Sequence, residues 1–202
     1  MSSYSERYLP PSDADIRSVL LGRLRVRHSR EANVAFLEEL GLCRGQVRVD
    51  VAVVNGSIHG YEIKSDRDSL RRLTRQAEVY GMVLDRATLV VGPKHVSEAM
   101  AAVPDWWEVQ VAAAVGGGLR IKRLRRGRQN PTRDARALVE LLWLEDAQAF
   151  LAARGCLRGY GRRPRRELWD RICTLYPIDE IASAVREQLK TRADQRSAEP
   201  RT

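Results

Sequence analysis

The sequence predicts an α/β protein in which a mixed β-sheet is flanked by helices and followed by a small C-terminal helical part. Two stretches, 46–54 and 58–64, alternate apolar and polar residues as strands do. Three more strand-like stretches cover 87–91, 108–113 and 119–124, and helical spacing of apolar residues prevails after residue 132. With 202 residues the chain is long enough to bury a substantial core.

The first two strands are joined by Asn55-Gly56, a strong signal for a β-hairpin. A two-residue loop would pair Asp50 with Tyr61 and send Asp50 and Glu62 to opposite faces. A three-residue loop that includes the next serine sets Asp50 opposite Glu62 and puts the valines of the first strand on the face of Tyr61. We expect the second register, because it also agrees with the pattern of apolar residues.

Glu62 and Lys64 are two positions apart in a strand and therefore point to one face. With Asp50 opposite, two carboxylates and an ammonium group converge. Paired carboxylates repel unless they take up a proton or a cation, and oxygen ligands suit Mg²⁺ or Mn²⁺. This pattern predicts metal-assisted hydrolysis of a phosphodiester bond, in which Lys64 orients the nucleophile or stabilises negative charge. The alternative is an ordinary salt bridge on a surface strand pair.

A helix is expected directly after the second strand. Ser65-Asp66 can cap a helix that runs to about Gly81. Gln76 and Tyr80 are four residues apart and would share one side of this helix. They face the site in one interpretation and form a half-buried helix edge in the other.

A second, shorter helix is expected before the first strand. Apolar residues at 34, 37 and 40 are spaced as in a helix that ends at Gly41. This helix would bring Glu38 or Glu39 near the start of the Asp50 strand. A third acid is then available, although both glutamates also fit a solvated face.

These elements resemble the PD-(D/E)XK nuclease superfamily. The succession of a helix, a strand with an aspartate, a strand with E-x-K and a helix with Q-x-x-x-Y is similar to its restriction-endonuclease-like fold, and the glutamine and tyrosine resemble its RecB-like branch. The blocks GYEIKSD at 60–66, PDWW at 104–107 and LW at 142–143 more closely resemble an uncharacterised bacterial family assigned to this superfamily.

The resemblance implies a nuclease that depends on Mg²⁺ or Mn²⁺ and acts on nucleic acid. The implied catalytic residues are Asp50, Glu62, Lys64, Glu39, Gln76 and Tyr80, and the implied metal ligands are Asp50, Glu62 and Glu39. Glu39 stands for the acid that the superfamily carries on its first helix. Two departures are visible: Val49 replaces the usual proline, and only two strands are recognised between the helices where three are usual. We therefore expect the first strand to be missing.

Positive charge is concentrated in the second part of the chain. Residues 1–118 contain 15 basic and 15 acidic side chains, whereas residues 119–202 contain 20 and 11, which accounts for the net charge of +9. Such basic runs predict phosphate binding, although an arginine-rich composition that serves solubility is the alternative. The predicted nucleic-acid-binding residues are Lys122, Arg123, Arg125, Arg126, Arg128, Arg162, Arg163, Arg165 and Arg166.

Three regions are expected along the chain: a nuclease-like core over 1–128, a basic helical region over 129–192 and a disordered tail over 193–202. Within the second region the spacing predicts helices at 134–154, 166–176 and 178–192. No apolar stretch approaches the ~20 residues of a membrane span, and the first residues lack the apolar core of a signal peptide. A cytoplasmic protein is expected.

The partner is expected to be nucleic acid, with DNA preferred over RNA. Two other functions stay open: a nucleic-acid-binding protein that keeps the nuclease fold without cleaving, and an accessory subunit whose basic half docks onto a protein partner. A homodimer is also compatible with the sequence.

Overall fold

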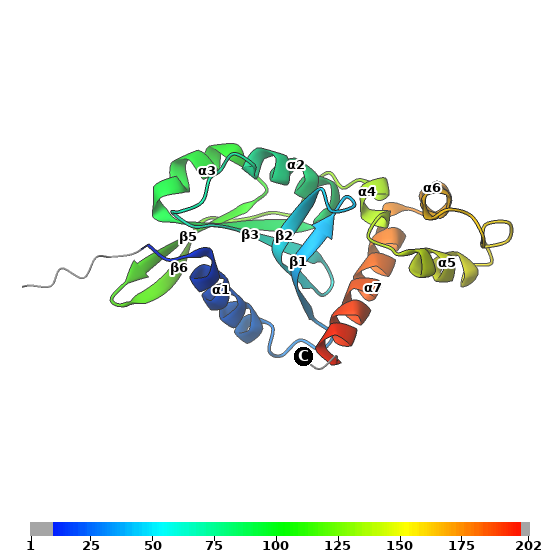
Figure 1. The fold of residues 1–202 in the computed structure, drawn as a ribbon, viewed down its shortest axis with the longest axis horizontal. Coiled ribbons are helices and arrows are strands. Elements are labelled where there is room, and N and C mark those ends of the chain that lie inside the picture. Colours follow the sequence, from blue (N-terminus) through cyan, green and yellow to red (C-terminus); the bar gives the residue numbers. More distant parts are fainter. Residues whose placement is uncertain (1–9, 199–202) are drawn as a thin grey trace, which may run out of the picture.

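A six-stranded sheet with helices on both faces forms the centre of the computed structural model, which describes residues 10–198 (Figure 1). The strands lie in sequence order, β1-β2-β3-β4-β5-β6. Neighbours pair antiparallel from β1 to β3, parallel from β3 to β5, and antiparallel again between β5 and β6. The strands are β1 (Ala35–Leu42), β2 (Val47–Val54), β3 (Ile58–Lys64), β4 (Arg86–Val91), β5 (Glu108–Val115) and β6 (Gly118–Arg125).

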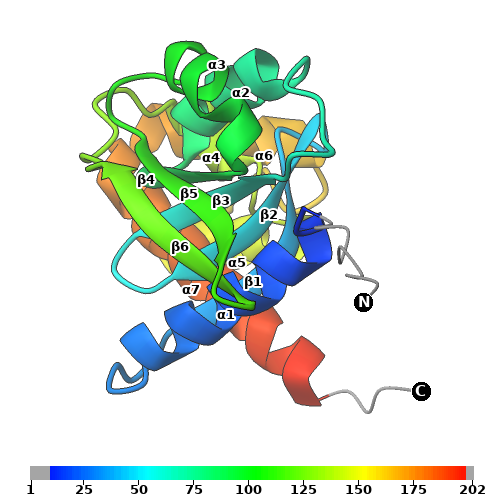
Figure 2. The ribbon, with the colours of Figure 1, turned by 90° about the vertical axis from the view of Figure 1, so that its left-hand side faces the viewer.

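Helices cover the two faces unequally. Figure 2 shows α2 and α3 on one side of the sheet and α1 on the other, and Figure 1 shows the remaining helices gathered beyond β1 and β2. The helices are α1 (Asp13–Arg27), α2 (Leu73–Val83), α3 (Val96–Ala102), α4 (Ala135–Val139), α5 (Leu144–Ala152), α6 (Arg165–Leu175) and α7 (Ile178–Ala198), and a 3₁₀ turn covers Pro93–His95. The predicted mixed sheet with flanking helices is confirmed.

Two hydrophobic clusters lie on the two faces of the sheet. The smaller one packs Ile16 and Leu20 of α1 against Val51 and Tyr61. The larger one joins α2 and α3 to the sheet and continues without a break into α4, α6 and α7. The helical region therefore shares its core with the sheet.

The hairpin between β2 and β3 has the predicted three-residue loop. Val54 pairs with Ile58 and Val51 with Tyr61, a register in which Asp50 is opposite Glu62. The valines do not all share one face, however. Val51 and Val53 lie in the cluster of Tyr61, whereas Val49, which lies beyond the last β2–β3 pair (Val51 with Tyr61), is buried in the other cluster.

The expected helix before β2 is wrong, and so is the expectation that a strand is missing. Ala35–Leu42 form β1, which pairs antiparallel with β2. Its alternation is interrupted at Glu39, whose φ is +54°. The buried residues are Ala35 and Leu37 before this point and Leu42 after it. The interruption shifts the phase of the apolar residues, and the resulting three-residue spacing imitates a helix.

The helix after β3 begins later than predicted. Ser65 belongs to a turn in which its N–H donates to Asp68 Oδ2 at 2.7 Å, and α2 starts only at Leu73, after Arg72. The predicted Ser65-Asp66 cap is therefore wrong. The end of the helix, Val83, lies two residues beyond the expected Gly81.

The predicted helix at 134–154 is two helices, α4 and α5. Trp143 has an extended backbone, and its N–H donates to Asp146 Oδ2 at 2.8 Å, which starts a new helix. The tail predicted from residue 193 is wrong up to Ala198, because α7 continues and buries Ala193 against the larger cluster. Residues 199–202 lie outside the described residues.

Among the helices of residues 10–198, none is both long and apolar enough to cross a lipid bilayer. The prediction about a signal peptide concerns residues 1–9, which are outside the described range.

Gly60→Ala is expected to destabilise the fold. A methyl group at this position would press against the side chain of Leu84 and lie 3.0 Å from Val49 Cγ1. Overpacking of this kind lowers the free energy of unfolding by about 1–3 kcal/mol. Gly22→Ala is the matched control, because its methyl group would enter open space on α1. The better helix propensity of alanine should raise the free energy of unfolding by about 0.5–1 kcal/mol. Urea unfolding measures both, and equal stabilities would contradict the packing described at β3.

Candidate active site

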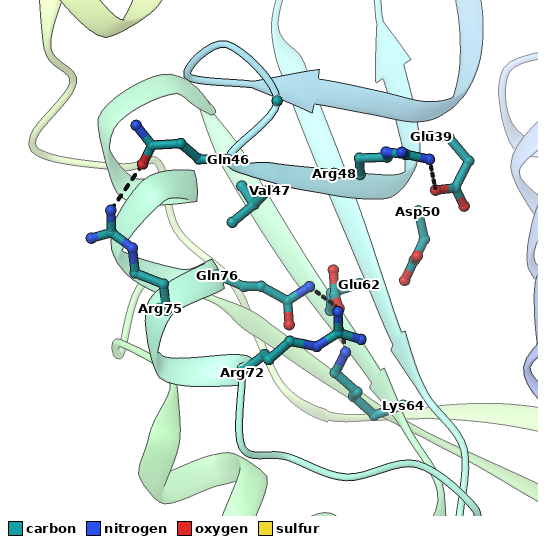
Figure 3. Close-up of a pocket in the computed structure, with 11 residues that line it drawn as sticks. Glu39, Gln46, Val47, Arg48, Asp50, Glu62, Lys64, Arg72, Arg75 and Gln76 are labelled. Atoms are coloured by element: carbon teal, nitrogen blue, oxygen red, sulfur yellow. Dashed lines mark hydrogen bonds and ion pairs between the residues drawn. The ribbon is translucent and has the colours of Figure 1, made fainter.

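A pocket of about 460 Å³ opens where β2 and β3 face α2 (Figure 3). Five of the six predicted catalytic residues line it, and Tyr80 lies behind Glu62. The lining residues are Glu39, Gly45, Gln46, Val47, Arg48, Asp50, Glu62, Lys64, Arg72, Arg75 and Gln76. The fold therefore brings together side chains from three strands and one helix.

Asp50 stands where β2 separates from β3. The last ladder pair is Val51 with Tyr61, and the N–H of Ile63 donates to Asp50 Oδ2 at 2.7 Å. The carboxylate thus takes the place of a strand partner, which fixes its position. Burial, followed by the nearby Glu62 carboxylate, raises the Asp50 pKa to about 7, although the Ile63 N–H opposes the shift.

Glu62 is 1% exposed and fully engaged by hydrogen-bond donors. Lys64 Nζ and Gln76 Nε2 each donate to Oε1 at 2.6 Å. The Tyr80 hydroxyl donates to Oε2. Burial raises the Tyr80 pKa above its ordinary value, and the Glu62 carboxylate adds to the shift, so the phenol keeps the proton that it donates. Three donors therefore hold a buried carboxylate in one orientation.

Tyr80 is itself fixed by aromatic packing. Its ring stacks on Trp107 with centroids 5.4 Å apart and an interplanar angle of 10°. Both side chains are fully buried. The tryptophan of the PDWW block thus supports the site from behind without reaching the pocket.

Arg17 of α1 is a site residue that the sequence analysis missed. It donates to Glu39 Oε1 at 2.9 Å, to the Asp50 carbonyl oxygen at 3.1 Å and to Asp50 Oδ1 at 3.2 Å. Asp13, one turn earlier, is 3.4 Å from the same guanidinium group. The one signal in the sequence was an arginine beside the apolar stripe of α1, four residues after an aspartate.

Glu39 is at the site, but on β1 and not on a first helix. It lies across from Asp50, between the pairs Glu38–Val51 and Leu40–Val49. Its carboxylate is occupied by Arg17 at 2.9 Å and approaches Arg48 at 4.0 Å (Figure 3). The third acid is therefore present and held by arginines.

The donor set fits a hard divalent cation in part. Asp50 and Glu62 offer carboxylate oxygens to one pocket. The Asp50 pKa is raised by burial and then by the Glu62 charge, and a cation would favour the ionised carboxylate against both. Glu39 can join them only when Arg17 releases it. Within residues 10–198, no three acidic, histidine or cysteine side chains already form a metal-binding cluster. A two-carboxylate site completed by water is what these residues can build.

The two basic runs lie far apart. Figure 1 places β6 at one end of the molecule and the α5–α6 loop at the other. In the first run Arg125 is not free, because it donates to the carbonyl oxygens of Trp107 and Pro104 at 3.1 and 2.8 Å. In the second run Arg165 lies over the Trp169 ring. The predicted residues therefore do not form one continuous surface.

Other arginines line the pocket itself, and the sequence analysis missed them. They are Arg48, Arg72 and Arg75. Arg75 is partly committed, since it donates to Glu78 and to Gln46, and Arg48 is 69% exposed. The carboxylate pair thus faces a basic rim.

The sequence pattern of bacteriophage P4 protein cII matches residues 11–199. The chain belongs to this family. Protein cII of Enterobacteria phage P4 is 31% identical over 97 residues, which are 48% of this chain and 37% of the phage protein. This chain therefore spans little more than a third of that cII protein.

Two other proteins are similar to this cII family member. A probable cobalt-precorrin-6B C(15)-methyltransferase (decarboxylating) from Pyrobaculum calidifontis is 28% identical over 148 residues, 73% of this chain and 70% of that protein. Among solved structures, the SPO1766 protein of unknown function from Silicibacter pomeroyi has a TM-score of 0.40 and 23% identity, and the match covers 74% of this chain and 94% of that one.

Stability should fall as the pH rises through neutrality because of Asp50. An unfolded chain releases this proton near pH 4, whereas the folded protein holds it to about pH 7. Between these values the folded state binds more protons, so the free energy of unfolding decreases with rising pH. Asp50→Asn removes this decrease in the free energy of unfolding. It should raise Tm by about 5 °C at about pH 8 and leave Tm nearly unchanged at about pH 4, as read by calorimetry.

Asp105→Asn serves as the control, because this aspartate is 89% exposed and its ion pair with Arg125 contributes little. Its Tm should stay within about 1 °C of the unmodified protein at both pH values. An Asp50→Asn gain of equal size at both pH values would contradict a raised Asp50 pKa.

Proposed function

We propose that this protein is a metal-dependent nuclease that hydrolyses phosphodiester bonds in DNA and has a restriction-endonuclease-like fold. The observation that carries the proposal is the convergence of Asp50, Glu62 and Lys64 in one pocket. The order of elements supports the fold: a helix, three antiparallel strands, a second helix and a parallel strand.

Asp50 and Glu62 would hold the metal ion, and Glu39 would become a ligand after release from Arg17. Bound Mg²⁺ or Mn²⁺ supplies an activated water molecule and neutralises charge on the scissile phosphate. A cation held there would favour the charged form of the Asp50 carboxyl group.

Lys64 acts beside the carboxylates. Its ammonium group is 2.6 Å from Glu62 Oε1 and lines the same pocket, so it orients the nucleophile or stabilises the developing charge on the phosphate. Gln76 and Tyr80 do not reach the phosphate in this scheme. They hold Glu62 in place, as their hydrogen bonds to its two oxygens indicate.

The basic rim supports a polyanionic substrate. Arg48 and Arg72 line the pocket. Arg48 is 4.0 Å from the Glu39 carboxylate, and Arg72 forms no ion pair within the described residues. Guanidinium groups bind phosphate oxygens through two parallel hydrogen bonds. The wall of the pocket therefore offers phosphate-binding groups to the substrate backbone.

A second candidate function is nucleic-acid binding without cleavage, and Arg17 favours it. Its guanidinium group already compensates Asp50 and Glu39, as a protein cation does where a metal is no longer needed. Cleavage by the purified protein separates the two functions.

The similarity to a methyltransferase carries no function over. Doubly wound nucleotide-binding sheets bind their ligand where the strand order reverses between parallel strands. Here the strands lie in sequence order, and only β3, β4 and β5 run parallel.

The decisive experiment incubates pure protein with single-stranded, duplex and branched DNA and with RNA, each with Mg²⁺ or Mn²⁺. Asp50→Asn and Glu62→Gln remove the charge that holds the metal, so cleavage should fall by about 10²-fold or more. Lys64→Ala should reduce the cleavage rate by a similar factor. Its Mn²⁺ binding, measured by calorimetry, should be unchanged.

Glu98→Gln is the matched control, because it alters an exposed glutamate on α3, and its cleavage rate should be unchanged. Cleavage by Lys64→Ala at the normal rate would remove the role assigned to Lys64. If the protein cleaves none of these substrates but binds DNA tightly, the result would support nucleic-acid binding without cleavage and contradict the nuclease.

The basic tract on β6 is expected to contribute to affinity. Lys122, Arg123, Arg126 and Arg128 are exposed, so their replacement by Gln should weaken binding to all sequences and reduce the salt slope by about one unit per lost phosphate contact. Fluorescence anisotropy at several salt concentrations measures both. Arg125→Gln should instead lower Tm, because this arginine bonds backbone carbonyl oxygens. An unchanged affinity and salt slope in the fourfold variant would exclude the β6 tract from the binding surface.

A further inference from the structure

A second groove of about 250 Å³ lies between β1 and the helical region. Its walls come from β1, from the turn after it, from the segment between α4 and α5, and from α6 and α7. The lining residues are Leu37, Leu40, Gly41, Arg44, Glu140, Leu141, Trp143, Arg165, Leu189, Arg192 and Arg196. The function proposed above does not use this groove.

Trp143 is the aromatic side chain that the groove presents. It is 51% exposed and the one aromatic residue among the exposed large hydrophobic side chains of the described chain. The guanidinium group of Arg192 lies 4.1 Å from its ring centroid. One face of the ring therefore rests on a cation, and half of the side chain remains in contact with solvent.

Arg192 is part of the scaffold under this ring. It donates to the Leu141 carbonyl oxygen at 2.9 Å and is paired with Asp146. These bonds fix the guanidinium plane and hence the orientation of the indole. A rigid, half-exposed ring on a fixed support is a platform on which a planar group can stack.

The charge of the groove is positive. Arg44, Arg165 and Arg196 are exposed, and none of them forms an ion pair with an acidic residue within residues 10–196. The one acid of the wall, Glu140, lies 3.6 Å from Arg136 Nε. Arg165 lies over the Trp169 ring and still has no acidic partner among the described residues. Cations without acidic partners around an aromatic platform match the phosphates and bases of a nucleic-acid strand.

The groove adjoins the catalytic pocket. Gly41 and Arg44 line the groove, and the next residues, Gly45 and Gln46, line the pocket. The tight turn between β1 and β2 thus separates the two hollows, with Arg44 on one side and Arg48 on the other. A nucleic-acid strand that crosses this turn would meet Arg44 on one side and Arg48 on the other.

We propose that this groove is a second subsite that binds a single-stranded segment of the nucleic acid, with a base stacked on Trp143 and phosphates on Arg44, Arg165 and Arg196. The inference rests on the proposed function in taking nucleic acid as the ligand. It specifies the substrate further: a duplex hides the faces of its bases, so the platform selects an unpaired strand or end.

Tryptophan emission reports this contact directly. The other tryptophans, Trp106, Trp107 and Trp169, are at most 8% exposed, so quenching by oligothymidylate should come from Trp143. In EDTA, which prevents cleavage, titration with oligothymidylate should quench the emission of the unmodified protein. Trp143→Phe should keep most of the affinity and lose the quenching.

Trp143→Ala should raise the Kd for oligothymidylate by about 5- to 100-fold, the factor that loss of one base–aromatic stack implies. The Kd for a duplex of equal length should change less than twofold or so. Arg44→Gln with Arg196→Gln should weaken binding and lower its salt slope by about two. Arg25→Gln with Arg30→Gln, which removes the same charge from exposed sites on and after α1, is the control.

Equal affinities of Trp143→Ala and the unmodified protein for the single strand would overturn the subsite, and so would equal losses for single strand and duplex. Thermal melts verify that each variant is folded. The outcome is separable from that of the proposed function, because binding is measured without metal. Trp143-dependent binding without cleavage would uphold the subsite and refute the nuclease, whereas cleavage with Trp143-independent binding would do the reverse.

Discussion

Burial of the Glu62 carboxylate is the constraint on which the arrangement of β2, β3 and α2 depends. A buried charge is tolerated only when donors surround it. Lys64 and Gln76 satisfy one oxygen and Tyr80 the other. These donors come from the same strand and from α2, so the helix must lie across β3 at one height, and the packing of Tyr80 on Trp107 extends that requirement to the segment before β5.

The second carboxylate of the pocket, Asp50, has fewer hydrogen-bond donors than Glu62. Asp50 enters the same pocket from β2, and within residues 10–198 one backbone donor and one arginine offset its burial. Its pKa is therefore raised to about 7, so Asp50 is near the midpoint of its titration at neutral pH. A carboxyl group with a pKa raised in this way is typical of sites that bind a cation or transfer a proton.

The register of the β2–β3 hairpin could be predicted, because turn chemistry and apolar pattern agree at 54–58. Gln76 and Tyr80 could be placed for a similar reason, since their spacing is helical whether α2 starts at residue 66 or 73. Glu39 could be identified as the third acid, but its strand could not: a positive φ within β1 shifts the apolar phase. Arg17 escaped prediction because long-range ion pairs leave no periodic trace in a sequence.

The sheet has two outer strands, and each is protected from pairing with another chain in a different way. β1 is bent at Glu39 and lies against α7, so its free edge offers no straight run of backbone donors and acceptors. The pairing of β6 with β5 is irregular between Arg123 and Arg125, and β6 carries Lys122 and Arg123 on its length. Charged outer strands repel their own copies and resist the edge-to-edge pairing from which aggregates grow. The basic residues of β6 thus help to keep the protein from polymerising, whatever ligand they bind.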